Sequence, residues 1–195
     1  MTMDSSVPKH WHTIESQPGP DLKIFKVRYD IVRNPRNSLE MKAVILETPD
    51  WVNVIAVTRT GKILVVDQYR FGAQNITTEI PAGMVSPGET PQQAAIRELR
   101  EETGFESPSW SYLGWVEPNP AFHDNRCHQF LARDAERTGP LKPEESESIT
   151  VRELTQGEII SEIAQGKMRN SLALLALSHV FNIWGSFQSA EYTSI

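Results

Sequence analysis

Apolar and polar residues near the start of the chain are arranged in a way that predicts β-structure. Runs rich in apolar and β-branched residues cover 22–32 and 39–46. The polar sequence NPRN between them is a turn signal. The polar, proline-containing segment before about Pro20 predicts a loop. We therefore expect residues 1–47 to form a small N-terminal β-appendage.

The next apolar runs predict the sheet of a main domain at residues 48–195. Val52–Thr58 and Lys62–Tyr69 flank the sequence Arg-Thr-Gly, which predicts a β-hairpin. Later runs of the same kind are short, and polar or turn-forming residues separate them. They predict strands at Tyr112–Val116, His128–Ala132 and Thr150–Leu154.

A helix with clear start and stop signals follows the hairpin. Thr90 is a good N-cap, Pro91 occupies the first helical position, and Gln93 stands at the capping-box position. Gly104 is expected at the C-terminal cap, so the helix covers Pro91–Thr103. Strands interspersed with helices predict an α/β (α+β) fold, in which a mixed sheet lies between helices. Two further helices are predicted, at Thr155–Gln165 and Asn170–Trp184.

Composition and charge narrow the function classes. The 195 residues are 39% hydrophobic and 23% charged, which suits a globular domain with a buried core. The net charge of −6, without a cluster of Lys and Arg, argues against nucleic acid as a partner and leaves small molecules. The single Cys127 fits a reducing compartment, and the chain shows neither a bilayer-spanning apolar run nor a secretory signal. We therefore expect a cytoplasmic protein without a membrane partner.

The first predicted helix carries three carboxylates on one side. At 3.6 residues per turn, Glu98, Glu101 and Glu102 fall within an arc of about 100°. Arg97 stands four residues before Glu101 and can form an ion pair with it. The apolar residues of this helix are expected to face the core: Ala95, Ile96 and Leu99.

Residue chemistry alone leaves two interpretations of these carboxylates. One is the ordinary solvated acidic face of a surface helix. The other is a divalent-cation site, because Glu98 and Glu102 repel each other unless a cation lies between them. The run Glu79–Gly83 just upstream ends in small residues, which let backbone carbonyls approach a ligand. Carboxylates and a carbonyl are hard oxygen ligands, which suit Mg²⁺ or Mn²⁺ rather than zinc.

The spacing of these residues resembles the Nudix box. Gly83, Glu89 and the run 97–105 (Arg-Glu-Leu-Arg-Glu-Glu-Thr-Gly-Phe) match its fixed positions. The flanking pattern is similar too, so the resemblance extends over roughly residues 22–180. It implies a Nudix-type αβα sandwich around a mixed β-sheet, and metal-dependent hydrolysis of a diphosphate bond.

The resemblance also implies roles for individual residues. Glu98 and Glu102 look like the principal metal carboxylates, and Glu101 looks like the third, which also counts among the catalytic residues. The backbone carbonyl of Ala82 is similar to the main-chain metal ligand of the family. Glu89 resembles the residue that braces the loop against the helix. The implied cofactor is Mg²⁺, with Mn²⁺ as a substitute.

Residues outside the box resemble the branch of ADP-ribose and nucleoside diphosphate sugar pyrophosphatases. By this likeness Arg70 meets the diphosphate and Glu79 lies at the substrate end of the site, whereas an ordinary surface charge is the alternative for Arg70. Pro120 stands where a proline is typical of ADP-ribose hydrolases. Trp51 is a candidate to stack on the base, and core packing is the alternative for its side chain.

Two further glutamates are candidates for the catalytic base. Enzymes of this branch carry a glutamate in the loop before the last predicted strand, where it holds a metal or orients water. By position Glu147 fits this role best and Glu145 second. A solvated acidic loop is the alternative interpretation.

The implied reaction cleaves ADP-ribose or another nucleoside diphosphate sugar into a nucleoside monophosphate and a sugar phosphate. In this branch the N-terminal β-appendage is exchanged between subunits, so a homodimer is expected. Two alternatives remain open. One is a Nudix hydrolase of a dinucleoside polyphosphate, coenzyme A or an oxidised nucleotide, and the other is a module that binds nucleotides without cleaving them.

Overall fold

The computed structural model describes residues 7–142 and 148–184. The chain divides into two compact units, each of which is described by itself. The first unit comprises Met1–Pro49 and Glu117–Arg126, and the second comprises Asp50–Val116 and Cys127–Ile195. The first unit thus combines the N-terminal segment with a stretch that comes much later in the sequence.

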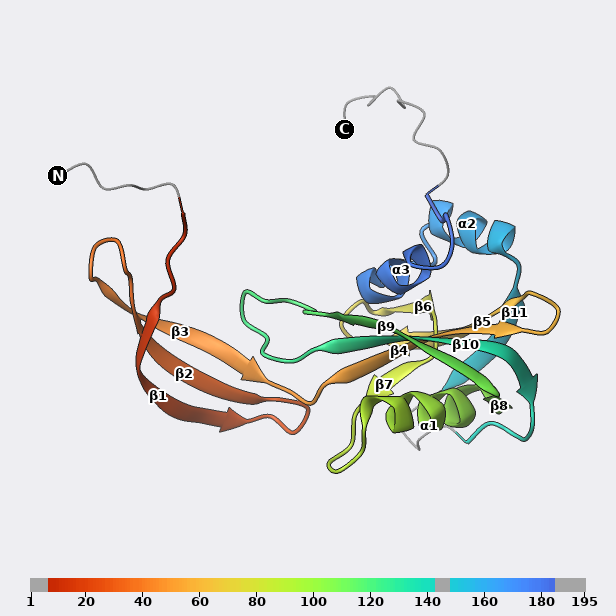
Figure 1. The fold of residues 1–195 in the computed structure, drawn as a ribbon, viewed down its shortest axis with the longest axis horizontal. Coiled ribbons are helices and arrows are strands. Elements are labelled where there is room, and N and C mark those ends of the chain that lie inside the picture. The colour runs from red at the N-terminus through yellow and green to blue at the C-terminus, as the bar shows by residue number, and fades with distance from the viewer. Residues whose placement is uncertain (1–6, 143–147, 185–195) are drawn as a thin grey trace, which may run out of the picture. The chain divides into compact units, whose positions relative to one another are not determined.

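A three-stranded antiparallel sheet forms the first unit, with β2 between β1 and β3 (Figure 1). The predicted turn between β2 and β3 is confirmed, because the Ser38 N–H donates to the Asn34 carbonyl at 2.8 Å. Alternating side chains along each strand point to opposite faces of the sheet. The strands are β1 (His12–Asp21), β2 (Lys26–Arg33) and β3 (Glu40–Glu47).

Two predictions for the start of the chain are wrong. Strand β1 begins at His12 and occupies the later part of the segment that is expected to be a loop. Its prolines are tolerated because β1 is an edge strand, and its register breaks between Pro18 and Asp21. The strand predicted over 22–32 begins only at Lys26. The preceding residues form the turn of the β1–β2 hairpin, in which Lys23 adopts a φ of 70°.

The second unit is built on an eight-stranded mixed sheet, whose main path has the order β11-β5-β4-β10-β8. Strands β4 and β10 pair in parallel, whereas the other neighbouring strands are antiparallel. Strand β6 is attached to β5, β7 to β4 and β9 to β10. The strands are β4 (Trp51–Thr58), β5 (Ile63–Arg70), β6 (Asn75–Glu79), β7 (Ala82–Met84), β8 (Phe105–Glu106), β9 (Ser109–Val116), β10 (Cys127–Arg137) and β11 (Ile149–Leu154).

The predicted hairpin of β4 and β5 is confirmed. The Thr58 N–H donates to the Lys62 carbonyl at 2.8 Å, and Gly61 adopts the left-handed φ of 78° that this turn requires. Strands β6, β7 and β8 were not predicted. They contain two to five residues each and carry too few apolar positions to produce a recognisable alternation.

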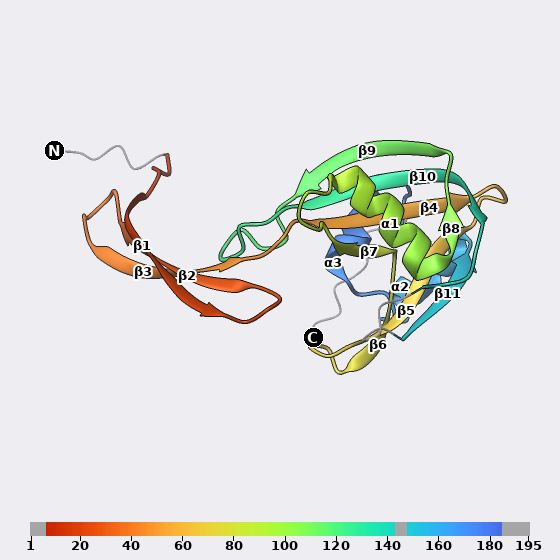
Figure 2. The same ribbon diagram turned by 90° about the horizontal axis from the view of Figure 1, so that it is seen from below.

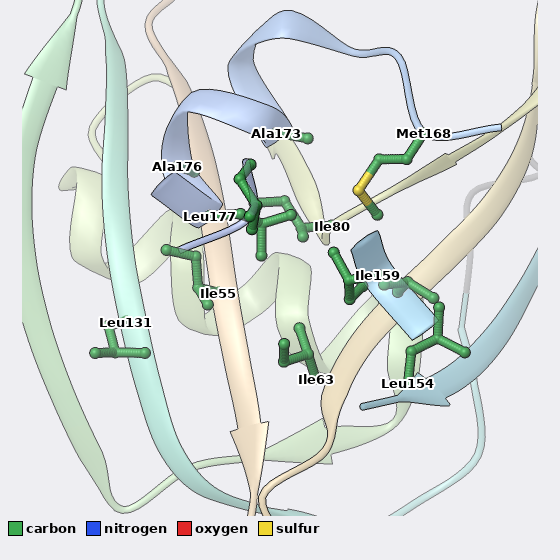
Figure 3. Close-up of a cluster of buried hydrophobic side chains, with 12 residues drawn as sticks. Ile55, Ile63, Ile80, Leu131, Leu154, Ile159, Met168, Ala173, Ala176 and Leu177 are labelled. Carbon is green, nitrogen blue, oxygen red and sulfur yellow. The ribbon is translucent and has the colours of Figure 1, made fainter. Parts of the chain in front are cut away.

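Helices cover both faces of the large sheet. Helix α1 (Pro91–Thr103) lies on one face, and α2 (Gln156–Ala164) and α3 (Ser171–Ser178) lie on the other (Figures 1 and 2). The expected αβα sandwich around a mixed sheet is therefore confirmed. Under α1 the core contains Val52, Val54, Leu64, Ala95, Leu99 and Phe130. Under α2 and α3 it contains Ile55, Ile63, Ile80, Leu131, Ile159 and Leu177 (Figure 3).

The last helix is shorter than predicted. The expected span was Asn170–Trp184, but α3 ends at Ser178 and the chain continues in turns. The Val180 N–H donates to the Leu177 carbonyl only three residues back, which marks a tightened last turn. Ile183 is nevertheless buried, so apolar residues beyond α3 reach the core without helical structure. Within the described ranges, the helices lack the length and apolar character needed to cross a bilayer.

Candidate active site

Helix α1 begins and ends where the local signals predicted. The Thr90 hydroxyl accepts a hydrogen bond from the Gln93 N–H, and the Gln93 side chain accepts one from the Thr90 N–H, which completes the capping box. At the other end Gly104 adopts a φ of 72°, and its N–H donates to the Arg100 carbonyl at 2.8 Å. These caps fix the register at which the helix presents its glutamates.

The buried side of α1 includes a carboxylate. The prediction that Ile96 faces the core is wrong, since this residue is 42% exposed. On the helical wheel Ile96 lies about 20° beyond Thr103, at the edge of the buried arc. Glu102, in contrast, is only 3% exposed. The residues that α1 buries are Ala94, Ala95, Leu99, Glu102 and Thr103.

Strand β7 holds two of the helix carboxylates close to the backbone. Its Ala82 N–H donates to Glu102 Oε2 at 3.0 Å. Beside it, a Cβ atom on Gly83 would overlap the carboxylate of Glu98, so a larger residue at this position would force that carboxylate to move. Pairing with Val52 and Asn53 of β4 keeps β7 in place. Strand β7 and the acidic side of α1 are therefore packed against each other.

Arg97 forms ion pairs with three neighbouring carboxylates. Its guanidinium donates to both oxygens of Glu89 at 3.0 Å, to Glu98 at 2.7 Å and to Glu101 at 3.1 Å. It also donates to the Met84 carbonyl at 2.9 Å. The hydrogen bonds to Glu89 are the main reason why the pKa of Arg97 is raised, and the same contact lowers the pKa of Glu89. The predicted pairing of Arg97 with Glu101 is confirmed, and Glu89 and Glu98 belong to the same ion-pair cluster.

The carboxylate oxygens near β7 suit a hard divalent cation in chemical type. In the present arrangement two of the three predicted ligands, Glu98 and Glu101, contact Arg97, and Glu102 accepts from Ala82. Within residues 7–142 and 148–184, no group of three His, Cys, Asp or Glu side chains is arranged to hold a metal. Because a carboxylate has two oxygens with several lone pairs, these contacts leave the glutamates able to accept a cation as well.

The structure brings Arg70 and Glu79 together in a part-buried, two-pronged ion pair. Arg70 Nε lies 2.8 Å from Glu79 Oε1, and Arg70 Nη2 lies 2.9 Å from Oε2. Thr77 and Asn170 donate to the same carboxylate at 2.6 and 2.7 Å. Burial alone would raise the pKa of Glu79, but the hydrogen bonds from Arg70 and Thr77 outweigh it, and the pKa is lowered. Glu79 is therefore charged at neutral pH and anchors Arg70.

The remaining predicted residues lie at different places in the chain. Trp51 begins β4, is half-buried and pairs in register with Met84 of β7 and Cys127 of β10. Pro120 belongs to the first unit. Glu145 and Glu147, the candidates for the catalytic base, lie outside the described residues.

A second charged network connects β5, β6, β11 and α2. Arg152 donates to both oxygens of Asp67, at 2.6 and 2.8 Å, and to both oxygens of Glu162, at 3.3 and 3.2 Å. The Thr78 hydroxyl bonds to the same two carboxylates. Glu162 has a lowered pKa, mainly through its hydrogen bonds with Arg152. Sequence reasoning did not single out these residues, because their positions are spread over nearly a hundred residues.

Sequence reasoning also missed Thr77 and Asn170. Thr77 lies on a short strand that was not predicted. The sequence predicts only that the last helix begins at Asn170. In the structure Asn170 is the N-cap of α3, because its Oδ1 accepts hydrogen bonds from the Leu172 and Ala173 N–H groups. Its contact with Glu79 joins residues 91 positions apart, and a single sequence carries no signal for such a contact.

Comparisons with known proteins identify the family of the chain. The NUDIX domain model matches residues 48–174. An ADP-ribose pyrophosphatase of Bacillus subtilis is 30% identical over 74% of this chain and 78% of its own. The methanol dehydrogenase activator of Bacillus methanolicus is 32% identical, over 86% of this chain and 91% of its own.

Solved structures show the same fold. The crystal structure of an ADP compounds hydrolase matches with a TM-score of 0.78 and 17% identity, over 90% of this chain and 95% of that one. The residues matched by the domain model include β7, helix α1 and the Arg70–Glu79 pair. The chain therefore belongs to the Nudix hydrolase family.

Proposed function

We propose that this enzyme hydrolyses the diphosphate bond of ADP-ribose or another nucleoside diphosphate sugar, giving a nucleoside monophosphate and a sugar phosphate. Relatives that are ADP-ribose pyrophosphatases support this substrate class, among them the proteins of B. subtilis and Mycobacterium tuberculosis. The observation that carries the proposal is the acidic side of α1. Glu102 is buried against the Ala82 N–H there, and Gly83 leaves room for the Glu98 carboxylate.

Mg²⁺ is the proposed cofactor, with Mn²⁺ as a substitute. The residues that would hold it are Glu98, Glu101, Glu102 and the Ala82 carbonyl. When bound, a divalent cation supplies the positive charge that an acidic site needs before it can accept a diphosphate. Glu98 and Glu101 already form ion pairs with the cationic Arg97, which supports a site whose charge favours cations.

Arg70 is the proposed contact to the substrate phosphates. Guanidinium groups bind phosphate oxygens through paired hydrogen bonds. The Arg70 side chain is 43% exposed although its partner Glu79 is buried, so the positive charge is held at the surface of the domain. Glu79 accepts two hydrogen bonds from the Arg70 guanidinium and so fixes its orientation.

Glu147 is the proposed catalytic base, with Glu145 as the second candidate. Hydrolysis needs a group within hydrogen-bond reach that takes a proton from the attacking water. The two residues are assigned by their place before β11 in the sequence, because both lie outside the described residues. Trp51 is the proposed stacking partner of the base.

We also propose that the enzyme acts as a homodimer joined through the first unit. Among the described residues of that unit, the buried side chains are polar and the large apolar ones are exposed or half-buried. A three-stranded sheet without an apolar core is marginally stable by itself. Exchange of this unit with a second subunit would bury apolar side chains that a single chain leaves in contact with water.

A substrate panel tests the proposed function. The enzyme is incubated with ADP-ribose, other nucleotide sugars, dinucleoside polyphosphates, coenzyme A and oxidised nucleotides, with Mg²⁺, with Mn²⁺ and with a chelator. Phosphate released after phosphatase treatment reports cleavage. Preferred cleavage of nucleotide sugars that needs the metal supports the proposal. Preference for another compound contradicts the substrate class, and binding of ADP-ribose without cleavage supports a sensing module.

One relative favours a second candidate function. The methanol dehydrogenase activator is similar to this chain over most of both lengths. We propose regulation of a dehydrogenase as the alternative to a role as a nucleotide-sugar hydrolase. The test measures methanol oxidation by a methanol dehydrogenase with and without this protein. A rate that does not change removes the alternative.

A further inference from the structure

A buried carboxylate connects helix α3 to Arg70. Glu79 is 2% exposed, and its two oxygens accept hydrogen bonds from three side chains. Arg70 donates through Nε and Nη2. Thr77 donates its hydroxyl to Oε1, and Asn170 donates its Nδ2 to Oε2. Each carboxylate oxygen therefore has a second donor besides Arg70.

We propose that Thr77 and Asn170 are positioning residues, which act through Glu79 to fix the orientation in which Arg70 meets the substrate phosphates. This inference rests on the phosphate-binding role proposed for Arg70 above. Neither residue is assigned a contact with the substrate. Their effect is transmitted by hydrogen bonds to one carboxylate.

The geometry of the ion pair makes this transmission possible. In a two-pronged pair the guanidinium and the carboxylate lie nearly in one plane, so rotating the carboxylate rotates the guanidinium as well. Glu79 engages the Nε and Nη2 edge of Arg70, which directs the Nη1 end of the fork away from the carboxylate. Thr77 and Asn170 prevent the carboxylate from rotating, because they hold different oxygens.

Asn170 is itself held by helix α3. Its Oδ1 accepts hydrogen bonds from the N–H groups of Leu172 and Ala173, at 3.0 and 3.2 Å, as an N-cap does. These bonds set the plane of the amide and thereby the direction of Nδ2. Ala173 is buried in the core under α3. The packing of α3 on the sheet therefore sets the position from which Asn170 holds the Glu79 carboxylate.

Three variants separate positioning from stability. Asn170→Ser keeps a good N-cap but removes the donor to Glu79, and Thr77→Val removes a hydroxyl that Thr77→Ser retains. We expect Asn170→Ser and Thr77→Val to raise KM for the preferred nucleotide sugar about fivefold, the scale of one weakened charged hydrogen bond, with kcat within about twofold. Thr77→Ser should behave like the wild type.

A matched control is provided by Thr155, the N-cap of α2. Thr155→Ala removes the N-cap side chain of α2, which accepts a hydrogen bond from the Glu158 N–H. Like a change at Asn170 it alters a helix N-cap, but it breaks no hydrogen bond to Glu79. Its Tm should fall, because lost caps destabilise helices, while KM should stay unchanged. An equal rise of KM in Thr155→Ala would show that loss of stability explains the effect and would overturn the proposal.

A double-mutant cycle tests whether the effect passes through Arg70. In an Arg70→Ala background, Asn170→Ser should leave KM unchanged, because the orienting hydrogen bond has no guanidinium to orient. A fivefold rise that persists in this background overturns the proposal, as does an unchanged KM for Asn170→Ser alone.

Binding of α,β-methylene ADP, measured by calorimetry, keeps the inference separate from the proposed function. If the wild type cleaves no nucleotide sugar, the proposed function fails, and the probe decides about the positioning residues. The positioning role is supported if Asn170→Ser binds the probe about fivefold more weakly than the wild type. In the Arg70→Ala background the same substitution should leave binding unchanged. Equal binding of the probe by the wild type and Asn170→Ser overturns the positioning proposal. Absence of binding to the wild type overturns it as well.

Discussion

At the residue scale, the acidic side of α1 depends on the backbone of Ala82 and Gly83. One residue donates an N–H to Glu102, and the other leaves the space in which the Glu98 carboxylate lies. Arg97 then offsets part of the negative charge of Glu89, Glu98 and Glu101. A change of a single atom at β7 is therefore expected to reach the carboxylates directly.

Replacing Gly83 by alanine tests this dependence. The added Cβ would overlap the Glu98 carboxylate, which must then move. We expect Gly83→Ala to reduce turnover at least about tenfold and to lower the free energy of unfolding by about 1–3 kcal/mol. Steady-state kinetics and urea unfolding measure the two effects. Gly72→Ala is the control, because a Cβ there meets nothing within 4 Å. Normal turnover of Gly83→Ala would contradict a role for this close contact.

Glu102 offers a test in which the fold is preserved. Glu102→Gln removes the negative charge but keeps an oxygen that can accept the Ala82 N–H. We expect kcat to fall at least about 100-fold at saturating Mg²⁺, while the circular dichroism spectrum stays that of the wild type. Glu153→Gln, an exposed position on β11, should keep wild-type turnover. If Glu102→Gln keeps near-normal turnover, the role proposed for this carboxylate is wrong.

Helical spacing was sufficient to predict which glutamates share one side of α1. It did not predict that Glu102 is buried, or that Arg97 bonds to Glu89 as well as to Glu101, since those features depend on β7 packing against the helix. The Glu79 cluster was predictable only in part. Arg70 and Glu79 stand out as charges near a recognisable motif, whereas Asn170 reaches them only through the tertiary fold.

At the element scale, predictions succeeded where local chemistry decides the structure. The caps of α1 and the turn after β4 are set by neighbouring residues, and both were predicted. Strand β1 was missed because its prolines oppose strand formation locally, while pairing with β2 on one edge compensates for them. The end of α3 was also misplaced, because burial of Ile183 keeps the sequence apolar beyond the last helical residue.

The network around Arg152 joins four elements and should make stability depend on pH. Asp67 and Glu162 have lowered pKa values; for Asp67 burial opposes the shift, and hydrogen bonds from Arg152 and Thr78 outweigh burial. A carboxylate with a lowered pKa in the folded state contributes stability above its unfolded pKa of about 4, and this contribution is lost as the pH falls through the folded value.

We therefore expect Arg152→Met to lower the free energy of unfolding by about 1–3 kcal/mol at pH 7, because it leaves two partly buried carboxylates without their cation. The difference from the wild type should shrink as the pH falls through the lowered pKa values of these two carboxylates. Urea unfolding between pH 3 and 7 measures it. Arg59→Met, which breaks an exposed ion pair with Glu136, should have little effect at any pH. A difference that is constant with pH would refute this account.

At the scale of the whole molecule, the two units differ in how they are stabilised. The second has apolar cores on both faces of its sheet. The first exposes apolar side chains on the strand β3, including Met41 and Val44, which are about half exposed. Side chains along a strand alternate between its two faces, so Met41 and Val44, three positions apart, lie on opposite faces of the small sheet.

The proposed homodimer follows from this exposure and can be tested by charge. We expect Met41→Lys and Val44→Lys, made singly, to shift the mass in solution from dimer to monomer, because a buried lysine opposes association. Light scattering coupled to gel filtration measures the mass. Ile160→Lys, on the exposed side of α2, is the control and should stay dimeric. A wild-type protein that is monomeric at every concentration would exclude the dimer.

The parallel pairing of β4 with β10 has a consequence for how the chain folds. Cys127 lies beside Trp51, which precedes it by 76 positions, so this pairing joins strands that are far apart in the sequence, unlike the local hairpin of β4 and β5. During synthesis, β4 can pair with β10 only after most of the polypeptide has been made. Folding is therefore expected to be slow compared with proteins built from local hairpins, and chaperones would meet β4 while its apolar side chains still lack their final partner.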